Sequence, residues 1–287
     1  MLASLAGVLF DGFAYGMLLF LLSVGLSVTL GMMNFVNLAH CSFAMVGGYA
    51  TVTLMNRFGW PFLATLPMAF LFGSLISIVL ERTLYRRLYR SSDLDQCLLT
   101  IGIVFISVAA FAWFYSTEQQ SARPPEWLRG SIELMGMNFA VYRLFLILFG
   151  LAVTALLVFS LEYTRFGAQV RAAVDNQRMA RGLGIDVDRA FMLTFALGGG
   201  LAGLGGALAI EVVGLDPTFA LAYLVYVLIV VAVGGLGSIG GSFAAAAVLG
   251  ISDMAGKYYF PWLGAFLIYL VMVGLLMWRP QGLFGRR

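Results

Sequence analysis

Long apolar stretches, separated by shorter polar ones, follow one another along the whole chain. An α-helix needs about 20 apolar residues to cross a hydrocarbon core of about 30 Å. Stretches of roughly that length or more predict membrane-spanning helices, and they lie near residues 8–30, 38–56, 60–80, 98–116, 141–161, 190–212, 222–256 and 261–278. The pattern therefore predicts an all-α, polytopic helical membrane protein with about 8–9 transmembrane segments.

Two interruptions divide this pattern in a similar way. The stretch 222–256 is too long for one straight crossing, and it contains the glycine-rich run 234–241, GGLGSIGG. A second interruption, from Gly31 to His40, separates the first two stretches. Glycine runs weaken helices, so we predict two broken helices. Both breaks follow a span that runs inward and precede one that runs outward, which indicates a weak internal repeat of parallel orientation.

The first interruption carries polar side chains that are hard to explain in so apolar a setting. They are Asn34, Asn37, His40 and Ser42. Transporters place discontinuous helices beside the translocation pathway, and unpaired polar groups in hydrocarbon are costly. We therefore predict that these side chains either line a pathway or satisfy main-chain groups that the break frees. For His40, a hydrogen-bonded structural role is the alternative.

Asp253 lies inside the apolar segment that follows the second break. An ionisable residue within a membrane segment is expensive, and it commonly marks a pathway or a proton relay. We therefore include Asp253 among the candidate pathway residues. The alternative is a buried acid that pairs with a tyrosine, a main-chain amide or an arginine.

Composition and charge set the class and the sidedness. Of the 287 residues, 61% are hydrophobic and 11% are charged, far from the values of a soluble domain. Loop 81–96, loop 162–189 and the C-terminal tail hold 12 of the 17 basic residues, so the positive-inside rule places them in the cytoplasm. Parity then gives nine crossings, with the N-terminus outside and the C-terminus cytoplasmic. A re-entrant segment at one break is the alternative. The start of the chain lacks a basic region, so no cleaved signal peptide is expected.

The central loop 162–189 is the longest charged interval in the chain. Helix-favouring residues from 168 to 182 predict one short amphipathic helix in this loop. Gly182 and Gly184 are expected to end it, because glycine commonly follows a helix C-terminus. From composition alone, the helix could be no more than a solvated connector.

Small side chains in that helix favour a second interpretation, in which it docks against another protein. Ala172 and Ala173 would then allow close approach of the partner, with Arg171 and Asp175 on an adjoining face. This interpretation predicts that Ala173 faces the partner and not the core of its own chain.

Several kinds of site are missing from the sequence. The only lysine, Lys257, is followed by Tyr258, so no GxxxxGK[ST] phosphate loop exists. The chain also lacks CxxC, HExxH and GxSxG motifs and has one histidine. We therefore expect no catalytic residues, no metal site and no cofactor in this chain. Cys41 and Cys97 lie near the arginine-rich side, where no disulfide is expected.

The glycine-rich run 198–206 is explained most simply by close helix packing. The loop 117–140 is expected to make a short ordered excursion at the membrane interface.

Four motifs in order along the chain carry a resemblance. They are GL…NFVNLAH…GGYA (residues 25–50), G…RAA…N…A…GID…R (residues 167–189), GGLGSIGG (residues 234–241) and RPQGLFG (residues 279–285). With these motifs the chain resembles the LivH-type permeases of branched-chain amino acid ABC transporters. Family members often read His-Gly-Glu where this chain reads His40-Cys41-Ser42, and this departure leaves the substrate open.

The resemblance implies a single transmembrane permease domain over residues 1–287 and an ATPase-coupling segment within loop 162–189. The coupling residues it implies are Arg171, Ala172, Ala173, Asp175, Asn176, Ala180 and Gly184. It also implies a second permease subunit, two cytoplasmic ATPase subunits that carry ATP and Mg²⁺, and a periplasmic solute-binding protein. The expected location is the bacterial inner membrane, and the expected cargo is branched-chain or hydrophobic amino acids, or a related small amphipathic solute.

Two other functions remain as alternatives. One is the permease of a sugar-type ABC importer of the same superfamily. The other is an ion-coupled carrier or channel, which the scarcity of intramembrane ionisable residues disfavours: beyond Asp253, only Asp11 and Glu211 lie near the ends of spans.

Overall fold

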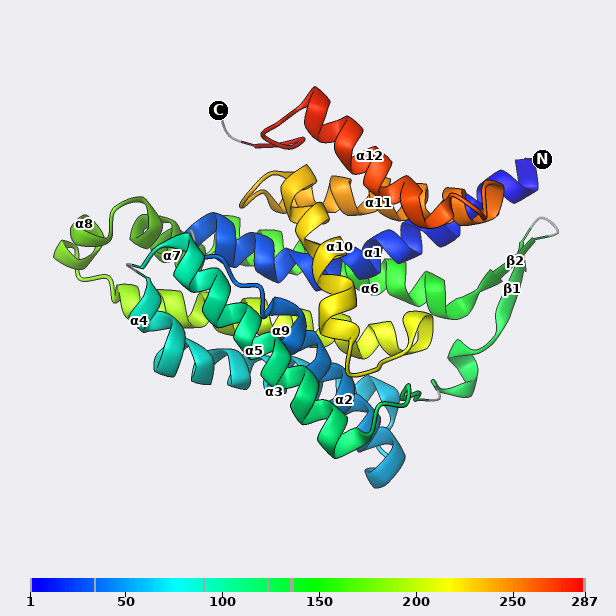
Figure 1. Ribbon diagram of the computed structural model, residues 1–287, viewed down its shortest axis with the longest axis horizontal. Coiled ribbons are helices and arrows are strands. Elements are labelled where there is room, and N and C mark those ends of the chain that lie inside the picture. The colour runs from blue at the N-terminus through cyan, green and yellow to red at the C-terminus, as the bar shows by residue number, and fades with distance from the viewer. Residues whose placement is uncertain (1, 34, 90, 123, 135–136, 286–287) are drawn as a thin grey trace.

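The computed structural model describes residues 2–33, 35–89, 91–122, 124–134 and 137–285. In these residues the chain forms nine helices of 15 residues or more (Figure 1). They are α1 (Leu2–Met33), α2 (His40–Phe58), α3 (Phe62–Leu80), α5 (Asp93–Tyr115), α6 (Val141–Tyr163), α9 (Val187–Val213), α10 (Phe219–Gly234), α11 (Ile239–Tyr259) and α12 (Gly264–Trp278). The predicted all-α membrane protein is confirmed, since six of the described helices are long and apolar enough to span a membrane.

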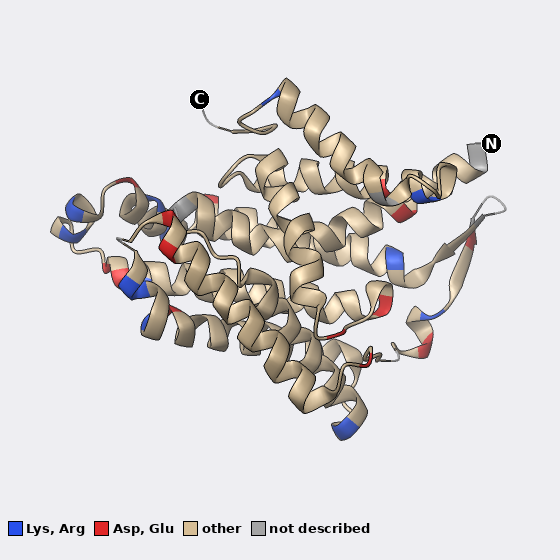
Figure 2. Ribbon diagram, in the orientation of Figure 1, with Lys and Arg blue, Asp and Glu red and all other residues tan. Residues whose placement is uncertain are grey.

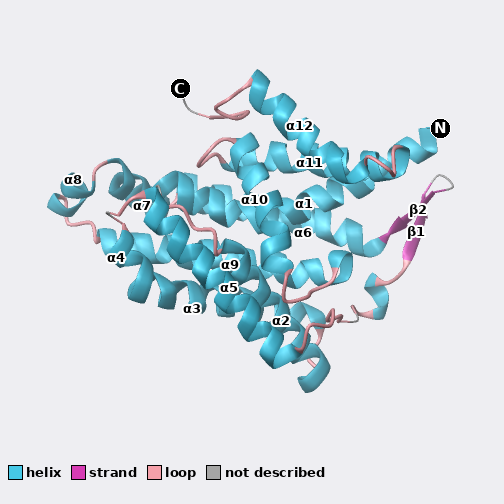
Figure 3. Ribbon diagram, in the orientation of Figure 1, coloured by secondary structure: helices cyan, strands magenta, loops and turns pink. Residues whose placement is uncertain are grey.

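Short elements connect the long helices. A π-helical turn (Glu81–Tyr85) and α4 (Arg86–Leu88) extend α3, and α7 (Arg165–Asp175) and α8 (Gln177–Gly182) form the central loop. A 3-10 turn (Glu126–Leu128) and the antiparallel hairpin of β1 (Ser131–Leu134) and β2 (Met137–Ala140) lie between α5 and α6 (Figure 3). The excursion expected in loop 117–140 is therefore an ordered hairpin, which the helical pattern did not indicate.

Polar side chains mark where several helices begin. Ser92 forms a capping box with Asp95 at the start of α5, and Ser238 accepts a hydrogen bond from the Gly241 amide at the start of α11. Asp186 caps α9 in the same way through the amide of Arg189. These caps satisfy amides that the first helical turn leaves without partners.

Successive long helices run back and forth between two ends of the molecule, and the termini lie at opposite ends (Figure 1). Basic residues gather at the end where α4, α7 and α8 lie (Figure 2). Arg143 lies at the other end and pairs with Asp11, near the N-terminus. This arrangement agrees with an odd number of crossings. Four of the basic residues counted above lie outside the described residues: Arg90, Arg123, Arg286 and Arg287.

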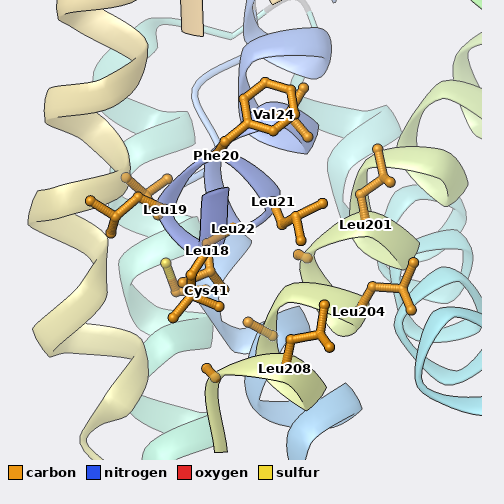
Figure 4. Close-up of a cluster of buried hydrophobic side chains, with 14 of the residues drawn as sticks. Leu18, Leu19, Phe20, Leu21, Leu22, Val24, Cys41, Leu201, Leu204 and Leu208 are labelled. Atoms are coloured by element: carbon orange, nitrogen blue, oxygen red, sulfur yellow. The ribbon is translucent and has the colours of Figure 1, made fainter. Parts of the chain in front are cut away.

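Helices α1 and α9 form the centre of the bundle. In each of these two helices, 89% of the most apolar 18-residue segment is buried inside the chain. The corresponding share is 33% or less in α3, α5 and α6. Leucines of α1 interlock with Leu201, Leu204 and Leu208 of α9, beside Cys41 of α2 (Figure 4). The outer helices, in contrast, expose apolar side chains such as Leu75, as a lipid-facing surface requires.

The glycine-rich run of α9 allows this central packing. A Cβ atom on Gly206 would overlap the carbonyl oxygen of Ala44 in α2, and one on Gly203 would overlap that of Ala69 in α3. The predicted role in close helix packing is confirmed, because only a hydrogen at these positions lets the three backbones approach so closely.

Candidate functional site

The two predicted breaks exist, and they lie against each other. Helix α1 ends at Met33 and α2 begins at His40, while α10 ends at Gly234 and α11 begins at Ile239. A Cβ atom on Gly31, in the last turn of α1, would overlap the backbone of Gly237 in the second break. Nearby, the Ser242 hydroxyl of α11 donates to that of Ser27 in α1 across 2.9 Å. Segments about 200 residues apart therefore form one junction at the arginine-rich end.

Side chains of α5 satisfy the main chain at the first break. The Val36 amide donates to Gln96 Oε1 across 2.9 Å, and the Leu38 amide donates to Thr100 Oγ1 across 3.2 Å. Asn37 contributes from within the break, since its Oδ1 accepts the amide of Ala39 at 3.1 Å. The sequence analysis overlooked Gln96 and Thr100, although polar residues four apart at the start of an apolar span were a readable signal.

The polar residues predicted at the first break are buried inside the chain. His40 and Asn37 are each 1% exposed, and Ser42 is 4% exposed. The Ser42 and Ser107 hydroxyls share a hydrogen bond of 2.8 Å. The His40 ring lies beside Gly25 of α1, at the place where Gly25 packs on Gly198 of α9. Its Nε2 has no hydrogen-bond partner among the described atoms. In this conformation none of the three reaches a surface that solute could contact. Asn34 lies outside the described residues.

Asp253 is paired with a lysine, a partner that the sequence analysis did not consider. The carboxylate is 1% exposed and lies 2.6 Å from Lys257 Nζ, one helical turn further along α11. The ammonium group also lies 5.4 Å from the ring centre of Tyr15 in α1. Tyr223 and Tyr226 of α10 contact each other through their rings on the same side of the bundle. Asp253 is thus a buried carboxylate paired with a half-exposed lysine, towards the end of α11 that lies opposite to the central loop.

The central loop contains two helices, so the prediction of one helix over 168–182 is wrong. The chain turns at Asn176, whose backbone is extended with φ −152° and ψ 96°. The Asn176 side chain accepts the amide of Met179 at 3.0 Å and so caps a new helix. Asparagine competes for main-chain hydrogen bonds in this way and favours helix starts over helix interiors. The expected end is confirmed, since α8 stops at Gly182 and Gly184 adopts φ +81°.

Ala173 faces its own chain, so the prediction that it faces a partner is also wrong. It is fully buried with Val170 of α7 and Phe191 of α9. Ala180 of α8 is 2% exposed in the same cluster, and Ala172 is partly buried. This small core fixes α7 and α8 on the end of α9. The small residues therefore serve packing within the chain, and the outward face is made by other side chains.

The outward face of α7 and α8, which we call the coupling face, combines charged and apolar groups. Large apolar side chains are exposed on α7, on α8 and directly after it: Val174 at 37%, Met179 at 64% and Leu183 at 78%. The polar members of the face are Arg171, Asp175, Asn176, Gln177 and Arg178, and Gly184 is exposed beside them. Exposed apolar groups rimmed by charge are typical of a protein contact. The sequence analysis overlooked these three because it looked for small residues.

Hydrogen bonds and surface ion pairs join the coupling face to neighbouring helices. At the start of α7, Thr164 accepts the amide of Gly167, and the Arg171 guanidinium donates to the carbonyl of Leu161 at the end of α6. On the other side, Asp188 pairs with both Arg86 and Arg181, which joins the loop to the extension of α3. These contacts tie the face to α6, to α9 and to the extension of α3.

A groove lies between α7 and the second break. Its volume is about 790 Å³. The groove is lined by the end of α1 and of α6, by α7, by the second break and by the C-terminal tail, through Gly31, Val158, Glu162, Arg171, Ala172, Val174, Asp175, Leu236, Gly237, Ser238, Ile239, Gly240 and Phe284. The end of α1, the second break and α7 thus line one groove at the arginine-rich end. Within the described residues, no cluster of three or more histidine, cysteine, aspartate or glutamate side chains could hold a metal ion.

Comparisons with known proteins agree with this arrangement. A family model described as "Branched-chain amino acid transport system / permease component" matches residues 8–276. A probable branched-chain amino acid transport permease protein LivH of Methanocaldococcus jannaschii is 27% identical over 94% of this chain and 90% of the relative. The LivH permease of Escherichia coli strain K12 is 25% identical over 97% of this chain and 94% of the relative. The LivM permease of the same strain is 26% identical over 93% of this chain and 68% of the relative. No solved structure gives a significant match.

The family match runs from α1 into α12. It therefore includes both breaks, the central loop with α7 and α8, and the groove between them, except for the tail. A match over nearly the whole chain reflects a shared fold and not a shared motif. The chain belongs to the family of branched-chain amino acid transport system permease components.

Proposed function

We propose that this chain is the permease subunit of a binding-protein-dependent ABC importer in the bacterial inner membrane. Its cargo would be branched-chain or hydrophobic amino acids, or a related small amphipathic solute. Family membership supports the transport class. The observation that carries the proposal is the coupling face, which exposes Val174, Met179 and Leu183 beside the groove of the second break.

The proposed machine contains several other subunits. The chain is similar to both LivH and LivM permeases of one organism, which supports pairing with a second, related permease. ATP and Mg²⁺ would be held by two ATPase subunits at the arginine-rich end, which would be cytoplasmic by the positive-inside rule. A periplasmic binding protein would deliver solute at the opposite end, where the hairpin of β1 and β2 lies.

The chain itself would carry out the mechanical part of transport. Closure of the ATPase dimer on ATP would displace α7 and α8. Arg171 would pass that displacement to the end of α6 through the Leu161 carbonyl, and Asp188 would pass it to the α3 extension through Arg86. The shared groove would change shape with it, and so would the junction of the two breaks. Alternating access would follow from a bistable packing at that junction.

A charge placed on the coupling face tests this function. Met179→Glu should leave membrane insertion normal, because the side chain is 64% exposed. Burying its unpaired carboxylate against an apolar surface of an ATPase subunit should weaken that contact about tenfold or more. Copurification of the ATPase subunits with the affinity-tagged permease measures the loss.

The matched control is Ile132→Glu in β1, which places the same charge on a side chain that is 43% exposed at the opposite end. It should leave ATPase copurification unchanged. If Met179→Glu copurifies the ATPase subunits as well as the control does, the coupling face is only a connector and the proposed role is wrong.

A further inference from the structure

The C-terminal motif RPQGLFG, residues 279–285, packs against the second break. Helix α10 ends at Gly234, so its last carbonyls have no partner within the helix. The tail supplies two of the missing donors. The Leu283 amide donates to the Val233 carbonyl across 2.7 Å, and the Phe284 amide donates to the Gly234 carbonyl across 3.2 Å. The end of the broken helix is therefore capped by a segment about 50 residues further along the chain.

The motif is shaped for this contact. The Gly282 amide donates to the Arg279 carbonyl across 3.0 Å, and Arg279 Nη1 donates to the Leu283 carbonyl across 2.8 Å, so the tail folds back on itself. Gly282 has φ +80° and Gly235 has φ +93°, values that favour glycine. A Cβ atom on Gly282 would lie 2.5 Å from the Gly235 nitrogen. Any other residue at 282 would push the tail away from the break.

The tail also reaches the groove beside α7. Phe284 is 59% exposed and lines the groove together with Arg171 and Asp175 of α7. The second break also contacts α1, because its Gly237 packs on Gly31 at the end of that helix. The tail and α7 thus border the same groove, and the tail contacts the second break by main-chain hydrogen bonds.

We propose that residues 279–285 form a clasp that holds the second break in place and transmits displacement of α7 to it. The clasp is a positioning element: it touches no solute and acts through the end of α10. Its role in coupling rests on the proposed transport function, whereas its hydrogen bonding to the end of α10 does not. Without it, the break should open more often, and ATP hydrolysis should continue without matching transport.

A thiol reporter beside the break tests the hydrogen bonding of the clasp to α10. Ser242→Cys places a thiol of similar size at a fully buried position of α11 that packs against Gly234 at the end of α10, in a background with Cys41→Ala and Cys97→Ser. Gly282→Ala should raise the rate of labelling by a water-soluble maleimide about tenfold, because two hydrogen bonds to the break are lost. A chain ending at Arg279 should do the same, without relying on strain at position 282. Gly274→Ala in α12, where a Cβ also meets nothing, is the matched control and should not change the rate.

The complete transporter tests the coupling. Gly282→Ala should lower solute uptake per ATP hydrolysed about fivefold or more, while Gly274→Ala keeps the wild-type ratio. If labelling of the reporter thiol at position 242 stays at the control rate in both tail variants, the clasp does not hold the break, whatever the chain transports. If labelling rises but the ratio of uptake to hydrolysis is unchanged, the clasp has no part in coupling and the proposal is wrong.

Discussion

Individual polar side chains make a broken helix tolerable in this protein. The first break frees main-chain amides in a largely apolar bundle, and Gln96 and Thr100 of α5 accept two of them. An amide left without an acceptor costs more than the hydrogen bond contributes, because desolvation is not repaid. These two residues therefore determine the stability of the break, although neither belongs to it.

Thr100→Val tests that role with almost no change in shape. The Leu38 amide should lose its acceptor, and the free energy of unfolding should fall by about 1–3 kcal/mol. The control is Thr83→Val, at an exposed hydroxyl that donates to the Val79 carbonyl one turn earlier. It should change the free energy of unfolding by less than about 0.5 kcal/mol. Unfolding of the detergent-solubilised chain in an SDS titration gives both values. Equal values would mean that Thr100 does not support the break.

The predicted pathway residues show what a sequence can tell at this scale. The sequence correctly marked Asn37 as a residue able to satisfy a break, because a polar side chain in an apolar run needs a partner. It could not supply the partners Gln96 or Ser107, because these contacts depend on how the helices pack. Lys257 is different, since it follows Asp253 by one helical turn and its spacing was a readable signal. The pathway roles of Asn37, His40, Ser42 and Asp253 remain predictions, and all four are buried in this conformation.

At the scale of elements, the central loop is a small folded unit and not a tether. Its helices share a core with α9, and its ends are fixed by Arg171 and by Asp188. Amphipathic spacing predicted a helix here but not which face was covered by the chain itself. Periodicity reports that two faces differ, and an alanine suits either a docking contact or a tight core. Ala173 was therefore assigned to the wrong surface.

Gly167→Ala tests whether the joint between α6 and α7 matters for coupling. An added Cβ would overlap the Leu161 carbonyl, so α7 must shift. Overpacking of this kind costs about 1–3 kcal/mol, and the shift should lower solute-stimulated ATP hydrolysis about fivefold or more in the complete transporter. Gly182→Ala adds the same methyl group to α8 where nothing lies within 4 Å, and it should preserve the activity. Normal hydrolysis by both variants would show that the joint is not part of the coupling route.

At the scale of the whole molecule, two central helices organise the rest. Glycines of α9 admit α2 and α3, and the end of α1 meets the second break. Hydrophobic runs predicted the helices, glycine-rich and polar interruptions predicted both breaks, and arginine counts predicted which end is basic. Each of these is a local property of the chain. The meeting of the breaks and the capping of α10 by the tail are contacts between distant segments, which no local pattern encodes.

The most direct test of the account is transport by the complete, purified assembly in liposomes. With the cognate binding protein present and ATP available to the ATPase subunits, labelled leucine or a similar hydrophobic amino acid should accumulate inside the vesicles. Assembly without this chain should give no accumulation. Uptake that requires only an ion gradient, or that proceeds with this chain and no ATPase subunits, would contradict the account and identify a carrier or channel.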